Sequence, residues 1–327
     1  MAIKDKKGRS IDYARISLTD RCNYRCVYCM PEEGVSLLRH EEIMRYEEIS
    51  FLSRVLRELG VKKIRFTGGE PLLRKGIVPF LIDFRKKFSD MALSITTNAS
   101  LLAGCARGLS QVGLSGMNIS LDTLNREKFR NITRVGNIED VMYGIDSAIE
   151  AGITNIKTNT VLVRGFNDGE LFEILEYAWE KGIVPRLIEF MPLGDDVWEK
   201  RKFIGAPEIL ELLRSRGDWQ PLLSVGDVSQ PPVGPARYYV DSSTGKRVGL
   251  IEAVSHHFCS SCNRLRITSS GGLLPCLFAH EEIPLLSLIR CRDGEGLKKA
   301  ILRGIDFKPD CWEKIRDGKA RMSGIGG

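Results

Sequence analysis

The 327-residue sequence lacks the features that mark several common classes of protein. It has no uninterrupted apolar run of the roughly 18 residues that a membrane-spanning helix needs. The N-terminus is charged and no apolar signal core follows it, so we expect a cytoplasmic protein. Basic residues exceed acidic residues by only six, 48 against 42, and the longest basic cluster, Lys4–Arg9, is interpreted as a short terminal tag. These absences argue against membrane and nucleic-acid partners and favour a small anionic ligand.

Cysteine, in contrast, is abundant. The chain has nine cysteines, an odd number, and hydrophobic residues make up 43% of it. That apolar content is enough to form a core, and the length is typical of about two domains. In a compartment that keeps thiols reduced, many cysteines indicate metal binding or catalysis before disulfides.

Short apolar segments alternate with helical patterns through the first part of the chain. Six segments are predicted as buried strands: Tyr13–Thr19, Val61–Thr67, Met91–Thr97, Met117–Asp122, Asn155–Val163 and Val184–Phe190. Between them, apolar residues recur at helical spacing, as in Ile49, Leu52, Leu56 and Leu59 before Gly60. This alternation predicts a parallel α/β fold, and six units in place of eight predict an incomplete (β/α)6 TIM-type barrel.

The alternation stops after Phe190. We therefore predict a partial barrel over residues 1–195 and a smaller C-terminal α+β region over residues 196–327, which closes the barrel and holds five of the nine cysteines.

Three cysteines follow the first predicted strand. Cys22, Cys26 and Cys29 form a Cys-x3-Cys-x2-Cys pattern. Thiolates bind iron–sulfur clusters and zinc, and three ligands on a four-iron cluster leave one iron open for another molecule. The alternative is a structural zinc site, but such sites are normally closed by four ligands.

The Cys22–Cys29 pattern, with Tyr28 before its last cysteine, resembles the signature of the radical S-adenosylmethionine (SAM) superfamily. The resemblance implies a [4Fe-4S] cluster whose open iron binds SAM and whose electron cleaves it to methionine and a 5′-deoxyadenosyl radical. It also implies SAM contacts at the ends of the strands. These are Tyr28, Gly68, Gly69, Glu70, Thr96, Ser120 and Met191.

A second set of three cysteines, Cys259, Cys262 and Cys276, lies in the C-terminal region. Its spacing alone fits either zinc or a cluster, because His256, His257 and His280 are near and Cys291 is available as a fourth ligand.

The segment from Cys259 through Cys262 to Arg266, together with Cys276, resembles the GTP 3′,8-cyclase family of molybdenum cofactor (molybdopterin) biosynthesis. Matching segments run from Arg15 to the last residue. The resemblance implies a second [4Fe-4S] cluster, held by these three cysteines, whose open iron binds the guanine of GTP. It implies conversion of GTP to (8S)-3′,8-cyclo-7,8-dihydroguanosine 5′-triphosphate.

The sequence has no G-x4-G-K-[ST] phosphate loop, so cations for a triphosphate must come from scattered strand ends. By resemblance, the GTP contacts are Arg15, Lys63, Arg65, Thr96, Lys157, Arg186, Arg264, Leu265 and Arg266. Catalytic roles are implied for Arg264, Arg266 and the terminal Gly326 and Gly327. Glu189 is an alternative, internal partner for Arg186, and Ala99 departs from the glycine usual in the family.

Two other functions compete with this one. A radical SAM peptide-modifying enzyme with an auxiliary cluster would usually have more C-terminal cysteines than Cys291 and Cys311 add. A zinc-stabilised nucleic-acid-binding module would need a basic stripe with interleaved aromatic residues. The preferred interpretation implies a reductant protein, a downstream cyclic pyranopterin monophosphate synthase and a homodimer as partners, with no nucleic acid and no membrane.

Overall fold

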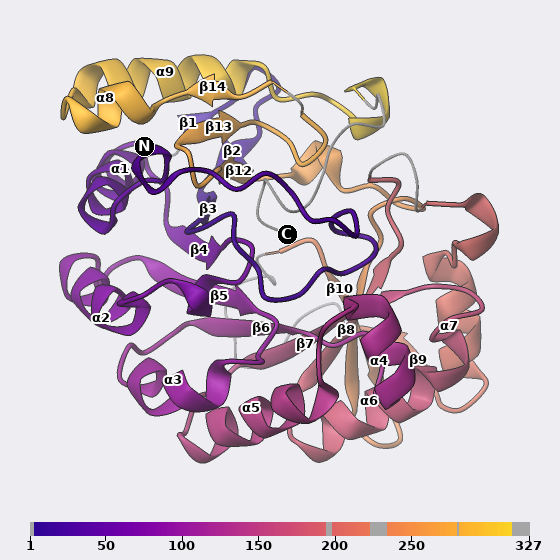
Figure 1. Ribbon diagram of the computed structural model, residues 1–327. Helices are drawn as coiled ribbons and strands as arrows, with labels where there is room; N and C mark the ends of the chain where they lie inside the picture. The colour runs from indigo at the N-terminus through magenta and orange to yellow at the C-terminus, as the bar shows by residue number, and fades with distance from the viewer. Residues whose placement is uncertain (1–2, 194–197, 223–233, 280, 316–327) are drawn as a thin grey trace.

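The computed structural model describes residues 3–193, 198–222, 234–279 and 281–315 (Figure 1). Its centre is a row of six parallel strands in chain order. They are β3 (Tyr13–Ser17), β4 (Lys63–Thr67), β5 (Ala92–Thr97), β6 (Gly116–Ser120), β7 (Ile156–Leu162) and β8 (Val184–Glu189). All six coincide with the predicted strands to within a few residues. Because the sheet that contains them runs as an open row from β14 to β9, the predicted incomplete parallel barrel is confirmed.

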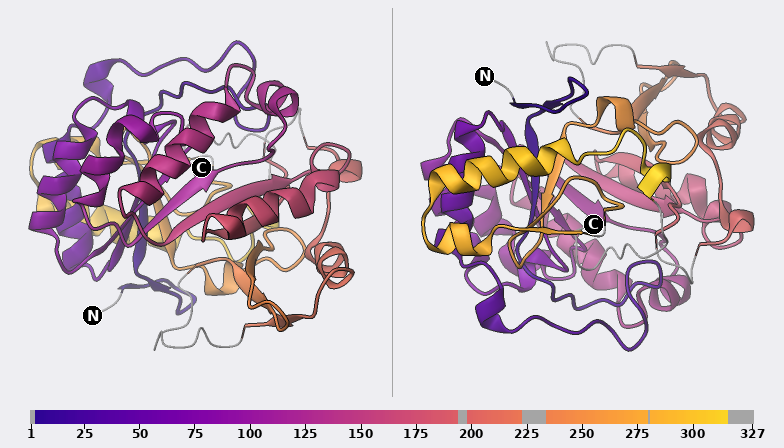
Figure 2. Two further views of the ribbon diagram at one scale, coloured as in Figure 1. Left: turned by 90° about the horizontal axis from the view of Figure 1, so that it is seen from below. Right: turned by 90° about the horizontal axis from the view of Figure 1, so that it is seen from above.

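Helices connect successive strands and cover the outside of the curved sheet (Figures 1 and 2). They are α1 (Tyr46–Glu58), α2 (Ile77–Lys87), α3 (Leu102–Ser110), α5 (Ile138–Glu150) and α6 (Leu171–Glu180). The apolar positions that predicted α1, such as Ile49, Leu52 and Leu56, are buried between helix and sheet. Burial of this apolar face stabilises the packing of α1 on the sheet. Helix α4 (Arg126–Thr133) was not predicted, because Phe129 and Ile132 are its only apolar residues.

The C-terminal region extends the same sheet at both edges. Strand β12 (Arg264–Ile267) pairs in parallel with β3, and β11 (Arg247–Ile251) pairs in parallel with β8. The remaining strands are β9 (Trp219–Pro221), β10 (Arg237–Asp241), β13 (Gly272–Leu274) and β14 (Ile283–Pro284). The sheet therefore runs across the predicted boundary near residue 195, and the division into two regions stays a prediction.

Three more helices and a hairpin complete the described structure. The helices are α7 (Ala206–Arg214), α8 (Leu286–Arg290) and α9 (Gly294–Asp306). Helices α8 and α9, yellow in Figures 1 and 2, pack beside α1. At the start of the chain, β1 (Ile3–Lys4) and β2 (Ser10–Ile11) form a separate antiparallel hairpin. Among the described residues, no helix has both the length and the apolar character to cross a membrane.

A close backbone approach joins α5 to the turn after β5. Ala99 in this turn has a φ of 63°, in the left-handed region that favours glycine, and its side chain is fully buried. Helix α5 lies against it at Gly144, where a Cβ atom would be 2.3 Å from the Ala99 carbonyl oxygen. The packing of α5 on this turn therefore requires a residue without a side chain at position 144.

Gly144→Ala should lower the free energy of unfolding by about 2 kcal/mol, because the obstructing atom belongs to the backbone and cannot rotate away. Gly104→Ala is the matched control, since Gly104 is exposed in α3 and a Cβ there would meet nothing within 4 Å. The control should raise stability by about 0.5–1 kcal/mol, because alanine restricts the unfolded chain. Urea denaturation measures both, and equal effects would contradict the packing argument.

Candidate active site

One cavity of about 360 Å³ occupies the interior of the partial barrel, and both cysteine sets line it. The first set follows the carboxyl end of β3, whereas Cys262 comes just before β12. Since β3 and β12 are parallel, the two sets lie at opposite ends of the barrel. All nine cysteines are free thiols. The cavity therefore lies between two groups of three thiols, which fits a small molecule held from both ends.

The first cysteine loop is fixed by the end of α4. The backbone N–H groups of Arg25 and Val27 donate to the carbonyls of Thr133 (3.0 Å) and Ile132 (2.9 Å). Arg134 Nη1 donates to the carbonyls of Arg25 and Met30, at 2.8 and 3.0 Å. The unpredicted helix α4 thus holds the loop in shape from outside, leaving the thiols to face the cavity.

Burial strongly disfavours free thiolates in this loop. Burial raises the pKa of Cys22 to about 11 and that of Cys29 to about 12, and it raises the pKa of Cys26 as well. Near neutral pH the raised pKa values favour neutral thiols, and binding of a metal favours the thiolates. Such a set of three sulfur donors fits an iron–sulfur cluster with one open iron.

The two glycines after β4 allow the chain to pass close to the residues that lead into Cys22. A Cβ atom at Gly69 would lie 2.2 Å from the Arg21 carbonyl oxygen, and one at Gly68 would lie 2.8 Å from that of Thr19. Gly69 N–H donates to the Thr19 carbonyl at 2.7 Å. The sequence suggested close approach to a ligand, whereas the structure gives these glycines a packing role as well.

Glu70, next in the chain, is buried beside the same cavity. Its carboxylate accepts hydrogen bonds from Leu72 N (3.0 Å), Thr97 Oγ1 (2.8 Å) and Asn98 N (2.7 Å). Burial raises the pKa of Glu70 to about 7, although these bonds favour its charged form. Glu70 therefore ties the end of β4 to the turn after β5.

The other predicted SAM contacts also line the cavity. Tyr28 is joined to Asp122 through a hydrogen bond from its hydroxyl to Oδ2 at 2.6 Å. Thr96 Oγ1 accepts from Arg65 Nη1 at 3.3 Å. Ser120 and Met191 face the same space. The structure thus brings all seven predicted SAM contacts together around one cavity, while their roles stay predictions.

Basic side chains form two rows across three neighbouring strands. In the first row, Arg266 of β12 is in register with Arg15 of β3, which is in register with Arg65 of β4. In the second row, Arg264, Tyr13 and Lys63 are in register in the same strand order. We call the five basic residues of these rows, which flank Tyr13, the cation rows. Like charges directly opposite each other are destabilising, so the cation rows favour an anion in the cavity.

The charges of the cation rows act on one another and on Tyr13. Burial lowers the pKa of Arg266 to about 10, and Arg264 contributes to this shift. Burial would raise the pKa of Tyr13, but the positive charges of Arg65, Arg15 and Lys63 lower it to about 7. Arg65 Nε donates to the Tyr13 hydroxyl at 2.7 Å. Tyr13 was not singled out from the sequence, where it appeared as an ordinary residue at the start of a strand.

Two further cations reach the cavity from β7 and β8. Burial lowers the pKa of Lys157 to about 8, with the charge of Arg186 adding to the effect. Arg186 is buried, and its Nε and Nη2 atoms have no hydrogen-bond partner among the described residues. The alternative prediction, that Glu189 pairs with Arg186, is wrong. The Glu189 carboxylate instead accepts hydrogen bonds from Ala206 N and Val254 N, at 2.8 and 2.7 Å.

Among the described residues, one predicted contact does not line this cavity. Leu265, between the two arginines of β12, is fully buried in the hydrophobic core and does not line the cavity. Its side chain faces away because alternate residues of a strand face opposite sides. Gly326 and Gly327 lie outside the described residues.

The second cysteine set has cationic neighbours. Burial would raise the pKa of Cys262, but the charges of Arg264 and Lys308 lower it to about 6. Lys308 Nζ donates to the carbonyls of Arg264 (2.8 Å) and Pro275 (2.9 Å), so it links the segments that carry Cys262 and Cys276. Cys262 is therefore prepared to present a thiolate, whereas burial raises the pKa of Cys259. Three sulfur donors gathered at one end of the cavity fit a second cluster.

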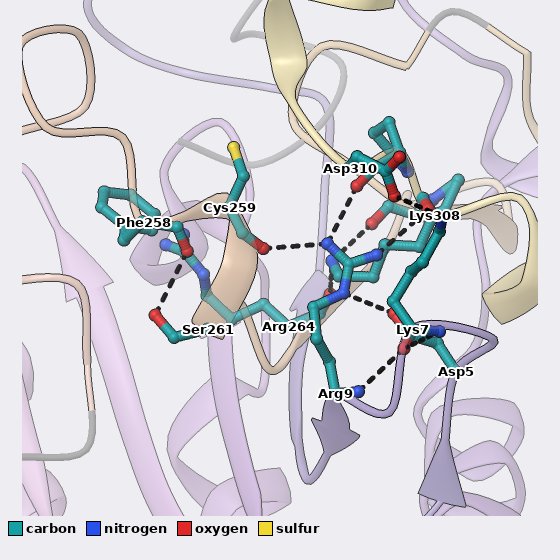
Figure 3. A network of polar contacts seen from close by, with 11 residues as sticks. Asp5, Lys7, Arg9, Phe258, Cys259, Ser261, Arg264, Lys308 and Asp310 are labelled. Atoms are coloured by element: carbon teal, nitrogen blue, oxygen red, sulfur yellow. Dashed lines mark hydrogen bonds and ion pairs between the residues drawn. The ribbon is translucent and has the colours of Figure 1, made fainter.

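A buried arginine anchors the second set from the N-terminal hairpin (Figure 3). Arg9 Nη1 donates to the carbonyls of Cys259 (2.8 Å) and Pro309 (2.9 Å), and Nη2 donates to that of Lys308 (3.0 Å). Its Nε donates to Asp5 Oδ2 at 2.5 Å. The interpretation of Lys4–Arg9 as a terminal tag is wrong, because the partners of Arg9 are about 250 to 300 positions away, at separations that local patterns do not reveal.

Comparison with known proteins adds independent findings. Residues 16–178 match the family model of the radical SAM superfamily, and residues 183–314 match that of Molybdenum Cofactor Synthesis C. The chain is 42% identical to the GTP 3′,8-cyclase of Thermodesulfovibrio yellowstonii, over 99% of this chain and 100% of that protein. It is 43% identical to the GTP 3′,8-cyclase of Peptoclostridium acidaminophilum, over 99% and 98%.

A solved structure with a similar fold is Streptococcus suis SuiB bound to S-adenosylmethionine. The TM-score is 0.63 and the identity is 15%, over 96% of this chain and 72% of that chain. At this identity the likeness concerns the fold alone.

Arg9→Gln should lower the free energy of unfolding by about 3 kcal/mol, because it leaves the buried Asp5 carboxylate without its cation. It should also increase the reaction rate of Cys259 and Cys262 with a maleimide, read by mass spectrometry at timed intervals. Arg39→Gln is the control, since Arg39 is 72% exposed and forms only surface ion pairs. If the two variants unfold at the same urea concentration, Arg9 does not anchor the second cysteine set.

The ligand-free protein should contain one tyrosine that ionises near pH 7, visible as tyrosinate absorbance that Tyr13→Phe removes. Because the folded pKa lies below the ordinary value of 10, Tyr13 stabilises the fold fully above pH 10 and loses this effect as pH falls through 7. Inorganic triphosphate should raise this pKa by neutralising the cation rows. Titration of every tyrosine near pH 10 would contradict the assignment.

Proposed function

The chain is a member of the GTP 3′,8-cyclase family of radical SAM enzymes, and we propose from this membership that it converts GTP to (8S)-3′,8-cyclo-7,8-dihydroguanosine 5′-triphosphate. This reaction opens the synthesis of the molybdenum cofactor. The observation that carries the proposal is one cavity with three thiols at each end and cations along its wall. Such an arrangement suits a radical source at one end and a nucleotide bound towards the other.

Each cysteine set would hold one [4Fe-4S] cluster through three ligands. Cys22, Cys26 and Cys29 would hold the first, and Cys259, Cys262 and Cys276 the second. SAM would contact Tyr28, Gly68, Gly69, Glu70, Thr96, Ser120 and Met191. When bound, the first cluster and SAM supply the one-electron cleavage that starts radical chemistry at the ribose, and the second cluster offers an open iron to guanine.

The side chains of this protein bind and orient the nucleotide. GTP carries about four negative charges near neutral pH, and guanidinium groups pair with phosphate oxygens bidentately. The cation rows supply Arg15, Lys63, Arg65, Arg264 and Arg266, while Lys157 and Arg186 approach from β7 and β8. A bound triphosphate would relieve the repulsion among these charges and give the Arg186 Nε and Nη2 atoms acceptors.

The barrel also protects the reaction. The wall of the cavity is built from sheet strands, so a ligand inside it is shielded from water on most sides. Arg264 and Arg266 lie on β12, which directly follows Cys262 of the second cysteine set. We therefore propose that they position the guanine base and the phosphates together. We also propose that Gly326 and Gly327 assist turnover, a role that rests on family resemblance.

The peptide-modifying alternative receives less support. The likeness to SuiB concerns fold alone, whereas the full-length relatives at 42–43% identity are GTP 3′,8-cyclases. Of the two remaining C-terminal cysteines, Cys291 is exposed at the end of α8 and does not line the cavity. Neither Cys291 nor Cys311 lines the cavity, so the described residues do not form a third set of three cysteines around it.

Several partners follow from the reaction itself. A reductant protein must supply electrons, and a downstream cyclic pyranopterin monophosphate synthase must consume the product. We propose a homodimer as the working form. We also propose a cytoplasmic location, because nine free thiols that include two cluster-binding sets require a reducing compartment.

Arg264→Ala combined with Arg266→Ala should abolish product while both clusters assemble. Loss of two charge-assisted contacts, each of about 1.5–3 kcal/mol, should reduce kcat/KM for GTP at least about a hundredfold. Anaerobic reconstitution with iron and sulfide counts checks cluster content, and chromatography of the reaction with SAM, reductant and GTP checks the product.

The matched control is Lys299→Ala with Arg303→Ala, which removes two exposed cations from α9. This control should keep full activity. Wild-type protein that forms no cyclised nucleotide would overturn the proposed function, and full activity of the β12 double variant would remove the role of the two arginines.

A further inference from the structure

A third thiol lies beside the second cysteine set. Cys311 Sγ is 3.6 Å from His257 Nε2, and these two atoms and Cys259 Sγ all lie within 4.8 Å of one another. Cys259 and Cys311 are partly buried, and His257 is exposed. The sequence placed His257 near Cys259 but did not connect Cys311 with them, because Cys311 is about 50 positions further along the chain.

The distances between these atoms are typical of ligands that share one metal ion, and they are too short for ligands on different irons of one cluster. Ligands of a tetrahedral Zn²⁺ lie at about 2.3 Å for sulfur and 2.0–2.1 Å for nitrogen, which separates a sulfur from a nitrogen ligand by about 3.6 Å. Thiolates on different irons of a cubane point away from one another and therefore stand farther apart. Cys311 is thus too close to Cys259 to be a fourth ligand of the same cluster.

The protein holds these ligands in place by contacts that need no metal. Arg9 binds the carbonyl of Cys259, and Figure 3 shows the Cys259 sulfur on the side away from Arg9. Trp312, the neighbour of Cys311, donates from Nε1 to the Ala253 carbonyl at 3.1 Å and stacks on Phe278 at a centroid distance of 4.7 Å. A site with ligands fixed in this way loses little entropy when an ion binds.

We propose that His257, Cys259 and Cys311 bind one soft divalent ion of the Zn²⁺ class in the cluster-free protein, and that this ion and the second cluster compete for Cys259. Two sulfurs and one imidazole nitrogen are preferred ligands of Zn²⁺, and water completes the fourth position. Glu313 Oε2, 3.7 Å from Cys311 Sγ, adds negative charge near the ion. Only the competition rests on the proposed function; the ion site itself does not.

Cobalt and zinc titrations of the iron-free protein test the site. Co²⁺ should bind once per chain and give the visible bands of a tetrahedral ion, with thiolate charge-transfer absorbance equivalent to two sulfurs. Zn²⁺ should displace it. Cys311→Ser should weaken Zn²⁺ binding about a hundredfold, because it removes one of the two sulfur ligands of the ion.

Two control variants distinguish this site from other zinc sites. Cys291→Ser should leave Zn²⁺ affinity unchanged, because Cys291 is exposed outside the group. Cys276→Ser should also leave it unchanged, although it removes a proposed cluster ligand. Unchanged affinity in Cys311→Ser, or equal losses in Cys276→Ser and Cys311→Ser, would overturn the site. Circular dichroism and urea unfolding of each variant confirm that the fold is retained.

The competition is tested by loading Zn²⁺ before anaerobic reconstitution. Wild-type protein should then bind about half the iron of the zinc-free sample, since only the first cluster assembles, and Cys311→Ser should regain full iron at the same Zn²⁺ concentration. Full iron content in zinc-loaded wild type would overturn the competition. Absence of cyclised nucleotide would instead contradict the proposed function, leaving the zinc titration unaffected.

Discussion

The repulsion among buried cations is the constraint on which the rest of the site depends. Arg266, Arg15 and Arg65 stand side by side on three adjacent strands, in an interior where charges interact strongly. The hydrogen bonds of Arg65 to Tyr13 and to the Ile95 carbonyl hold one of these guanidiniums in place. The apolar layer between sheet and helices stabilises the barrel enough to hold this unfavourable arrangement, which becomes favourable when a polyanion enters.

The parallel core could be predicted because its information is local. The strands are apolar runs bounded by turn residues, and their order along the chain is their order in the sheet. Helix α4 could not be predicted in this way, because it is only eight residues long and its two apolar residues are too few to form a repeating pattern. The pairing of β12 with β3 was also outside the reach of local patterns, since no periodicity indicates which distant strand completes an edge.

The functional site was likewise predictable only where its information is local in the sequence. The cysteine motifs and the scattered cations could be identified from residue type, spacing and family resemblance, whereas their mutual placement depends on register between strands. Leu265 was assigned to the substrate with its neighbours, although alternation along a strand turns it to the opposite face. Arg9 and Cys311 were missed because each acts through residues far away in the chain, where only the folded structure brings them together.

The edge pairing of β3 has a consequence for the order of folding. Asn263, just before β12, donates its side-chain amide to Asp12, 251 residues earlier in the chain. Contacts of such long range form late, because closing a large loop costs entropy before any contact is gained. During synthesis, β3 therefore has an unpaired edge until most of the chain has been made. The cavity that Cys22, Cys26 and Cys29 line therefore lacks one wall throughout this interval, and the pairing of β12 with β3 supplies it.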